Sequence, residues 1–232
     1  FAGIGPHDVV ALAAFGVTNR DFARLRERGC VVVDTTCGSV LLVWKTVERF
    51  ARDGFTAVIH GKYYHEETRA TASRALGQEG GAYLIVRDLG ETALVTDYIR
   101  NGGSEDALVR RFAEAISPGF DFQRDLVRVG VANQTTMLMR ETEAVEEEFR
   151  RAMADRYGEE ALDEHFRALD TICSATQERQ DAVVDLLADP PDLMIVLGGY
   201  NSCNTNNLAR ICGQVGPTYH IDDSWCVEGP DR

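Results

Sequence analysis

Two of the six cysteines lie in polar loops at the predicted ends of strands or helices. Cys37 follows Asp34-Thr35-Thr36, and Cys173 precedes a segment with apolar residues at helical spacing. A helix N-terminus favours a thiolate, and thiolates hold iron–sulfur clusters, whose ligands need only converge in space. A cysteine is also common as a small buried residue. The sequence leaves open whether the pair ligates iron or fills the core.

The remaining cysteines suggest no further site. Cys30, Cys212 and Cys226 are assigned structural roles, since they precede a strand, continue a helical stripe or lie near the C-terminal end. The absence of any CxxC pair argues against a zinc ribbon or a thioredoxin motif. A structural zinc protein is a third possibility, which would need four convergent ligands that the spacing does not supply. Scattered cysteines in a chain of 232 residues fit a reducing compartment.

His65, Glu66 and Glu67 place an imidazole beside two carboxyl groups, directly after the apolar run 55–59. An imidazole can hold a phosphate, and a carboxyl group shielded from water can carry a proton near neutral pH. Acidic residues are equally common in the first turn of a helix. Both interpretations remain open from these residues alone.

Two further loops offer neutral hydrogen-bonding groups before predicted helices. They are residues 133–136, which read Asn-Gln-Thr-Thr, and residues 201–205, which read Asn-Ser-Cys-Asn-Thr. Such groups, with the amides of a helix N-terminus, can bind phosphate oxygens, and the same residue types cap helices. No P-loop or GxGxxG motif is present.

The elements that position these loops follow one pattern: a short apolar run, a polar loop, then an amphipathic helical stretch. The apolar runs are residues 31–33, 55–59, 126–131 and 193–197. Strands that are buried on both faces and alternate with helices predict an α/β fold with doubly wound parallel sheets. Ligands of such sheets bind beyond the carboxyl ends of the strands, which is where these loops lie.

The composition limits the class of protein. The chain has 24 Lys and Arg against 37 Asp and Glu, a net charge of −13, and 44% hydrophobic residues. This acidity argues against nucleic acid or an anionic membrane surface as a partner. No apolar stretch approaches the roughly 20 residues that span a bilayer.

Five segments together resemble the 4-hydroxy-3-methylbut-2-enyl diphosphate reductase family, and the residues of two of these motifs look like those of its plant and cyanobacterial branch. They occur in the family's order and are residues 34–37 (DTTC), 61–71 (GKYYHEETRAT), 132–138 (ANQTTML), 171–180 (TICSATQERQ) and 201–205 (NSCNT). The resemblance covers essentially the whole chain. It implies three α/β units around a central 4Fe-4S cluster, and a reductive dehydroxylation that yields isopentenyl and dimethylallyl diphosphate, the last step of the methylerythritol phosphate route to isoprenoids.

The resemblance also assigns roles to individual residues. Cys37 and Cys173 match the second and third cluster ligands, Glu67 the proton donor, and Thr135 its hydrogen-bonding neighbour. The diphosphate binders that match are His65, Ser202 and Asn204. The family further implies a ferredoxin or flavodoxin as electron donor, and no nucleic-acid or membrane partner.

Some family positions are absent or altered. The first cluster cysteine and a following histidine are expected before Phe1, and a C-terminal serine after Arg232. Phe15 stands where many members have a histidine, Gly38 replaces a common proline, and Cys203 replaces a serine. The chain is therefore expected to be a fragment that is inactive alone, with residues 1–36 the remnant of a first unit, 37–170 a second and 171–232 a truncated third.

The altered positions keep a rival interpretation open: a diverged, non-enzymatic α/β protein that binds an anion and holds no cluster. A cytoplasmic location is expected for the reductase, or a plastid location if a transit peptide precedes Phe1.

Overall fold

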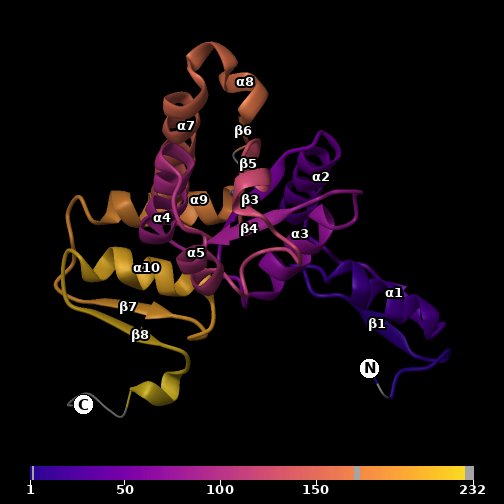
Figure 1. Ribbon diagram of the computed structural model, residues 1–232. Helices are drawn as coiled ribbons and strands as arrows, with labels where there is room; N and C mark the ends of the chain where they lie inside the picture. The colour runs from indigo at the N-terminus through magenta and orange to yellow at the C-terminus, as the bar shows by residue number, and fades with distance from the viewer. Residues whose placement is uncertain (2, 170–172, 228–232) are drawn as a thin grey trace. The chain divides into compact units, whose positions relative to one another are not determined.

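The computed structural model describes residues 1, 3–169 and 173–227 (Figure 1). The chain forms two compact units. The first comprises residues 1–135 and 140–171, and the second residues 136–139 and 172–232. All sheet pairing between the named strands is parallel.

The first unit begins with a small βαβ motif. Strands β1 (Val9–Ala11) and β2 (Val31–Val33) pair directly, and helix α1 (Asn19–Glu27) connects them. The Thr18 hydroxyl accepts a hydrogen bond from the Asp21 amide and caps α1, which satisfies one of the unpaired donors at a helix start. The segment that follows β2 leads directly into helix α2 (Gly38–Arg52).

The larger sheet of the first unit has four strands in the order β4-β3-β5-β6. The strands are β3 (Thr56–His60), β4 (Tyr83–Val86), β5 (Val129–Asn133) and β6 (Phe166–Ala168). The helices of this region are α3 (Glu66–Ala75), α4 (Leu89–Asn101), α5 (Asp106–Arg111), α6 (Phe122–Asp125), α7 (Met139–Tyr157), the 3₁₀ turn η1 (Glu159–Ala161) and α8 (Leu162–His165).

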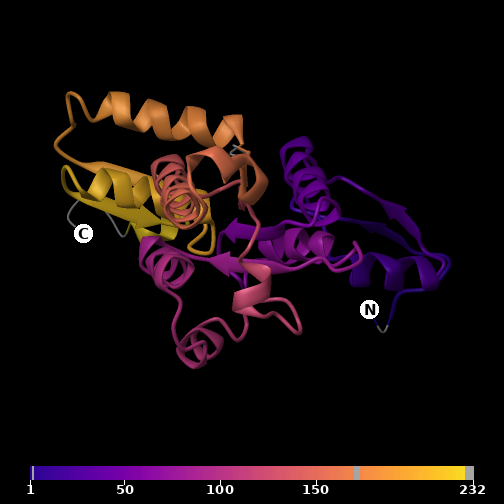
Figure 2. The same cartoon turned by 45° about the horizontal axis from the view of Figure 1, so that its top comes forward.

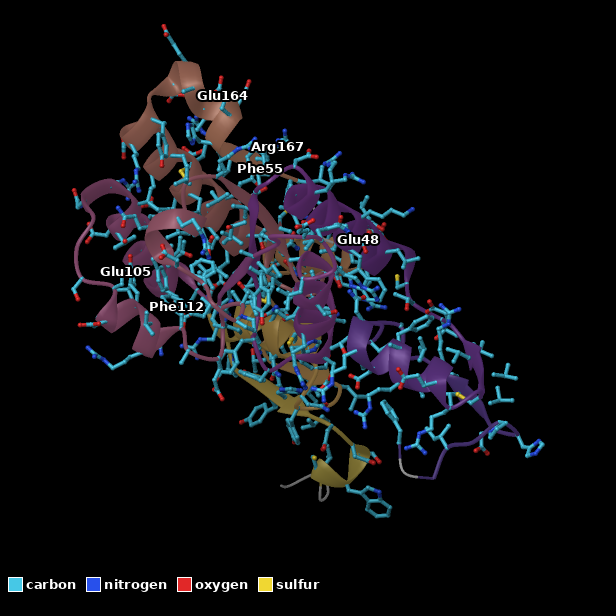
Figure 3. All side chains as sticks on the ribbon, turned by 45° about the vertical axis from the view of Figure 1, so that its right-hand side comes forward. Glu48, Phe55, Glu105, Phe112, Glu164 and Arg167 are labelled. Atoms are coloured by element: carbon cyan, nitrogen blue, oxygen red, sulfur yellow. The ribbon has the colours of Figure 1, made fainter. Side chains whose placement is uncertain are left out.

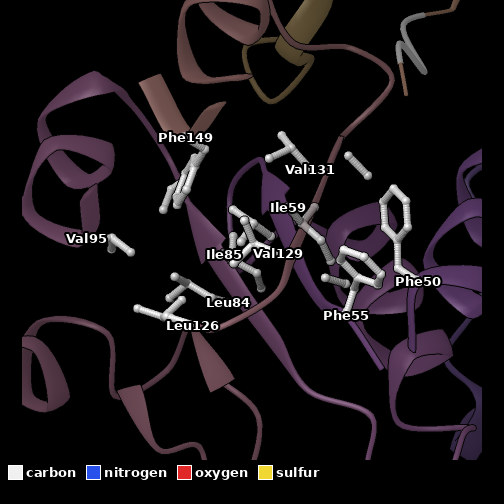
Figure 4. Close-up of a cluster of buried hydrophobic side chains, with 14 of the residues drawn as sticks. Phe50, Phe55, Ile59, Leu84, Ile85, Val95, Leu126, Val129, Val131 and Phe149 are labelled. Carbon is white, nitrogen blue, oxygen red and sulfur yellow. The ribbon is translucent and has the colours of Figure 1, made fainter. Parts of the chain in front are cut away.

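The strand order explains how the helices cover both faces of this sheet. The chain moves from β3 to β4 in one direction, and then returns past β3 to β5 and on to β6. Because crossovers between parallel strands are right-handed, the reversal places the later helices on the opposite face from α3. Figure 4 shows the result: Val95 of α4 and Phe149 of α7 lie on one side of the strands, and Phe50 of α2 lies on the other.

The core of the first unit lies within this sandwich. Every residue of β3 and β5 is buried, which is typical of strands covered on both faces. Helix α2 contributes Val43, Val47 and Phe50, each at most 1% exposed. The spacing of these residues is the four-and-three repeat of a helix with one apolar face.

The second unit contains one two-stranded sheet and two longer helices. Strand β7 (Met194–Leu197) pairs with β8 (Thr218–Ile221), and α10 (Cys203–Gly213) lies along both strands (Figures 1 and 2). Helix α9 (Ser174–Leu186) packs against α10, and the 3₁₀ turn η2 (Ser224–Cys226) follows β8. Ile195 and Leu197 of β7 are 57% and 66% exposed, so this sheet is covered on one face only.

The α/β fold with parallel sheets that the sequence predicts is confirmed. The expected strands are present with shifted ends, such as β5, which begins three residues later than the apolar run from Leu126. The sequence pattern did not identify β4, β6 or β8. The three-unit division stays a prediction, and its boundary at residues 170 and 171 lies outside the described residues. None of the helices in the described ranges is long and apolar enough to cross a bilayer.

Candidate functional site

The strand order makes the carboxyl ends of β3 and β5 the place where a ligand site is expected. These two strands are neighbours, with His60 opposite Asn133 at their carboxyl ends. The chain leaves β3 toward one edge of the sheet and leaves β5 toward the other. Diverging connections of this kind open a crevice, and ligands of open α/β sheets bind there. The loops that follow β3 and β5 are the ones that carry residues 61–67 and 134–135.

His65 ends the first loop and is the N-cap residue of α3. Its Nδ1 accepts a hydrogen bond from the Glu67 amide at 3.2 Å. A ring nitrogen that accepts this bond carries no proton, so this contact fixes the role of Nδ1 as an acceptor. The Phe15 ring, from the loop after β1, lies edge-on to the imidazole with 6.2 Å between ring centroids.

Gln134 ties the two loops together. Its side-chain oxygen accepts hydrogen bonds from the Thr68 hydroxyl at 3.0 Å and from the Lys62 amide at 3.2 Å. Gly61 leaves room for this bridge, because a Cβ on Gly61 would lie 2.9 Å from the Thr68 hydroxyl and 3.0 Å from the Gln134 Cβ. This bridging role could not be predicted from the sequence, because the side-chain amide of a glutamine in a polar loop can equally bind a ligand.

Glu67 and Thr135 form the centre of the site. Glu67 is 3% exposed, although it lies in the first turn of α3. Its Oε1 accepts a hydrogen bond from the Thr135 amide at 2.6 Å, and the Thr135 hydroxyl also hydrogen-bonds the carboxyl group. The structure thus brings together two of the residues singled out in the sequence, 68 positions apart.

The environment of Glu67 favours its protonated form. Burial raises the pKa of the Glu67 carboxyl group, and the hydrogen bonds from Thr135 and the nearby His65 oppose that rise. Desolvation is the largest of these effects because a buried carboxylate loses its hydration. A carboxyl group with a raised pKa and two donors ready for its anion can release a proton and then be stabilised as a carboxylate.

His60 lies beneath the site at the end of β3 and is fully buried. Its Nδ1 lies 2.8 Å from the Thr142 hydroxyl of α7. Burial lowers the pKa of His60 to about 4, so the ring is neutral at physiological pH. The packing therefore indicates a structural role for His60.

Cys37 is the N-cap residue of α2 and is exposed. The preceding loop is held by Asp34, whose carboxylate accepts hydrogen bonds from the Thr36 amide at 3.0 Å and the Thr36 hydroxyl at 2.5 Å. These bonds keep the pKa of Asp34 below its usual value. The Cys37 amide donates to Ala14 O at 2.8 Å, which fixes the cysteine next to the loop after β1.

The second unit carries the three remaining candidates. Cys173 is the half-buried N-cap residue of α9. Ser202 caps α10 by accepting the Thr205 amide at 3.3 Å, so the capping interpretation is confirmed here. Gly198 permits the turn before it, with a φ of +157° and no space for a Cβ beside the Thr205 side chain. Asn204 Oδ1 is buried and accepts no hydrogen bond from the described residues.

A cavity of about 700 Å³ lies away from these residues. It is lined by the amino ends of β3 and β4 and by the segment before β5, including Thr56, Ala82 and Val127. Nearby, Arg128 and Arg167 lie over the Phe55 ring at 4.1 and 4.2 Å (Figure 3). Arg128 also donates to the main-chain oxygens of Glu164 and Asp53, so its guanidinium group has a structural role at this end of the sheet.

The donor set matches iron ligation in type. Each of the two cysteines is itself the extended N-cap residue of a helix, a position where the amides and the dipole favour negative charge. The described residues contain no group of three or more His, Cys, Asp or Glu side chains that could hold a metal ion. Cys37 in the first unit and Cys173 in the second thus each offer a thiol of the type that ligates iron.

The comparison with protein families decides the classification. The model of the LytB protein family matches residues 2–229. The chain belongs to the LytB family.

Known LytB relatives carry the name that the sequence motifs suggested. The 4-hydroxy-3-methylbut-2-enyl diphosphate reductase of Thermosynechococcus vestitus is 53% identical over 225 residues, which are 97% of this chain and 55% of that protein. The reductase of the same name from Synechococcus sp. strain RCC307 is 54% identical over 223 residues, or 96% and 54%. The chain spans about half the length of these curated relatives.

Two solved structures of reductases have a similar fold. One, described as (E)-4-hydroxy-3-methyl-but-2-enyl diphosphate reductase, the terminal enzyme of the non-mevalonate pathway, is 25% identical with a TM-score of 0.55. The alignment covers 97% of this chain and 66% of that one. The Plasmodium falciparum reductase is 17% identical with a TM-score of 0.68, covering 95% and 57%. The recognition made from the motifs is therefore confirmed at the level of the family.

Proposed function

We propose that this chain is part of a 4-hydroxy-3-methylbut-2-enyl diphosphate reductase that forms isopentenyl and dimethylallyl diphosphate. The observation that carries the proposal is the buried carboxyl group of Glu67, held by Thr135 beyond the carboxyl ends of β3 and β5. Membership of the LytB family and the names of the relatives support the same reaction.

The reaction consumes two electrons and two protons. The allylic C–O bond breaks, a C–H bond forms, and the oxygen leaves as water. When bound, a 4Fe-4S cluster would supply the electrons and a Lewis-acidic iron that weakens the C–O bond. Cys37 and Cys173 are the residues of this chain that would hold it, together with a ligand from elsewhere.

Glu67 is the proposed source of the proton for the leaving oxygen. Burial raises the pKa of this carboxyl group, which shifts its equilibrium toward the protonated acid at the start of α3. After transfer, the Thr135 amide and hydroxyl stabilise the carboxylate, so the pair serves both states of the acid. Thr135 is thus a partner of the acid, in agreement with the role that its motif implies.

The diphosphate of the substrate is assigned to neutral donors. His65 places an imidazole at the N-cap of α3, next to Glu67. In the second unit, Ser202 and Asn204 lie in the first turn of α10, where the helix amides also favour an anion. Neutral donors suit a diphosphate because they add no negative charge beside it.

The wider context is part of the same proposal. A ferredoxin or flavodoxin would deliver the electrons, the location would be cytoplasmic, and the complete enzyme would have three α/β units, with residues 1–36, 37–170 and 171–232 belonging to successive units. A non-enzymatic anion-binding protein remains the alternative, since Gly38 and Cys203 depart from the family pattern.

Anaerobic reconstitution of the 232-residue chain and of its full-length gene product tests the proposal. We expect four iron atoms per full-length protein and diphosphate-dependent reduction of the substrate, with little iron retained by the short chain. Failure of both forms to bind four iron atoms and to reduce the substrate would refute the reductase. Binding of inorganic diphosphate without iron by the full-length protein would instead favour the anion-binding alternative.

A further inference from the structure

The exposed face of α2 is basic. Lys45, Arg49 and Arg52 are exposed and fall within one helical stripe, and Leu41 and Leu42 flank them at 36% and 49% exposure. The opposite stripe contains Val43, Val47 and Phe50 and is buried in the core. We refer to Leu41, Leu42, Lys45, Arg49 and Arg52 as the basic face of α2.

Most of this charge is not neutralised within the protein. Among the ion pairs between described residues, none involves Lys45 or Arg49, and Arg52 makes only a 4.0 Å contact with Asp53. Asp53 is bound more closely by Arg167. The acidic residue Glu48 of α2, labelled in Figure 3, is half-buried and lies at the edge of the stripe. The basic face therefore presents a net positive charge to solvent.

This face stands out against the charge of the rest of the chain. Residues 1–74 contain 10 Lys and Arg against 8 Asp and Glu, whereas residues 75–232 contain 14 against 29. An acidic partner would be repelled by most of the chain and attracted to the segment that includes α2. Charge distributions of this kind steer association and select orientation more than they add affinity.

The helix also connects this surface to the proposed site. Cys37 is the N-cap residue of α2, and Leu41 and Leu42 lie in the turn that follows it. The three cations lie farther along the helix, with Arg52 as its last residue, so a partner that covers the whole face reaches the Cys37 end through the leucines. Two exposed leucines beside three cations give the mixture of apolar contact and charged rim that transient protein interfaces use.

We propose that the basic face of α2 docks an acidic electron-carrier protein and orients it toward the Cys37 end of the helix. The inference rests on the proposed reductase function. Each docking of a reduced one-electron carrier delivers one electron and leaves the carrier oxidised, so one substrate turnover needs two dockings. The carrier's negative charge complements Lys45 and Arg49, and the leucines provide the contact that remains at high salt.

The test uses the full-length reconstituted protein and an acidic plant-type ferredoxin. Arg49→Glu is expected to raise the Kd for ferredoxin roughly tenfold and to lower ferredoxin-driven kcat/KM by a similar factor, because close charge pairs control such encounters. Lys45→Glu combined with Arg49→Glu is expected to give a larger loss. The wild-type Kd should rise with salt, and that salt dependence should be weaker in the variants.

Arg110→Glu is the matched control. Arg110 is exposed on α5, and no ion pair between described residues involves it. It changes the net charge by the same amount at a different place, so we expect an unchanged Kd. An equal loss of binding in Arg110→Glu and Arg49→Glu would overturn the proposal, because net charge would then explain both.

A small-molecule reductant separates this inference from the proposed function. Turnover driven by a photochemically reduced small donor should be the same in wild type and Arg49→Glu, since the substitution is on the outer face of α2. Wild-type turnover with the small donor and no change in ferredoxin Kd in Arg49→Glu would refute the docking face alone. The absence of turnover in the wild type with either donor would refute the reductase itself.

Discussion

The four-stranded sheet of the first unit and the two-stranded sheet of the second have the same parallel pairing but different burial. Every residue of β3 is buried, whereas Ile195 and Leu197 of β7 are more than half exposed. Each sheet carries polar loops at the carboxyl ends of its strands. In the first unit two such loops, after β3 and β5, meet and bury an acid, Glu67, and no such pair of loops occurs among the described residues of the second unit. Enclosure of the strands on both faces is what turns a polar loop into a desolvated site.

Glu67→Gln should have the largest effect. In the full-length reconstituted protein we expect kcat to fall at least 100-fold, because a positioned general acid typically contributes 10²–10⁴. Steady-state kinetics under anaerobic conditions measure the loss. Glu66→Gln is the control, since Glu66 is an exposed neighbour in the same turn that pairs with Arg69 on the surface. Equal activity in the two variants would contradict the role assigned to Glu67.

Ile59→Ala and Ile195→Ala compare the two sheets directly with one residue type. Ile59 is 0% exposed in β3 and Ile195 is 57% exposed in β7. We expect Ile59→Ala to lower the free energy of unfolding by about 2–5 kcal/mol and Ile195→Ala by less than about 1 kcal/mol. Urea unfolding of the 232-residue chain followed by circular dichroism gives both values. Similar losses would show that the contrast in burial is wrong.

His60 should make the first unit sensitive to acid. Its pKa is about 4 in the folded chain against 6.5 for an ordinary histidine. The unfolded state therefore binds more protons between these values, and stability falls as the pH drops from 6.5 to 4, by up to about 3 kcal/mol. The free energy of unfolding of His60→Asn, measured across this range, should lack that decrease. A parallel decrease in the variant would assign the effect to other groups.

Ser202→Ala should have the smallest effect. Ser202 accepts the Thr205 amide at the start of α10, and loss of an N-cap costs about 1 kcal/mol. Ser202→Gly should lower the free energy of unfolding by only about a few tenths of a kcal/mol, because glycine is tolerated at N-caps. Urea unfolding of the second unit measures both. A loss as large as that in Ile59→Ala would mean that this loop is enclosed as fully as the loop after β3.

The sequence predicted the strand–loop–helix order because buried parallel strands leave continuous apolar runs, as in residues 55–59. It did not identify β4, because this strand has only four residues and no chemically distinctive loop follows it. The residues of the site could be selected by their motifs, and the contact between Glu67 and Thr135 depends on a strand order that spacing does not reveal. The hydrogen bond between Gln134 and Thr68 was not predictable, because the sequence does not show whether the Gln134 amide faces a ligand or the neighbouring loop.

The pKa of Glu67 is the quantity that tests the account most directly. Nuclear magnetic resonance titration of the Glu67 side-chain carbon in the selectively labelled 232-residue chain would measure it. We expect the Glu67 carboxyl group to titrate with a midpoint above the ordinary value of 4.5. The midpoint should rise further in Thr135→Val, because the hydrogen bond from the Thr135 hydroxyl lowers the pKa of Glu67. A midpoint at or below 4.5 in the wild type would contradict a buried, proton-carrying acid at the centre of the site.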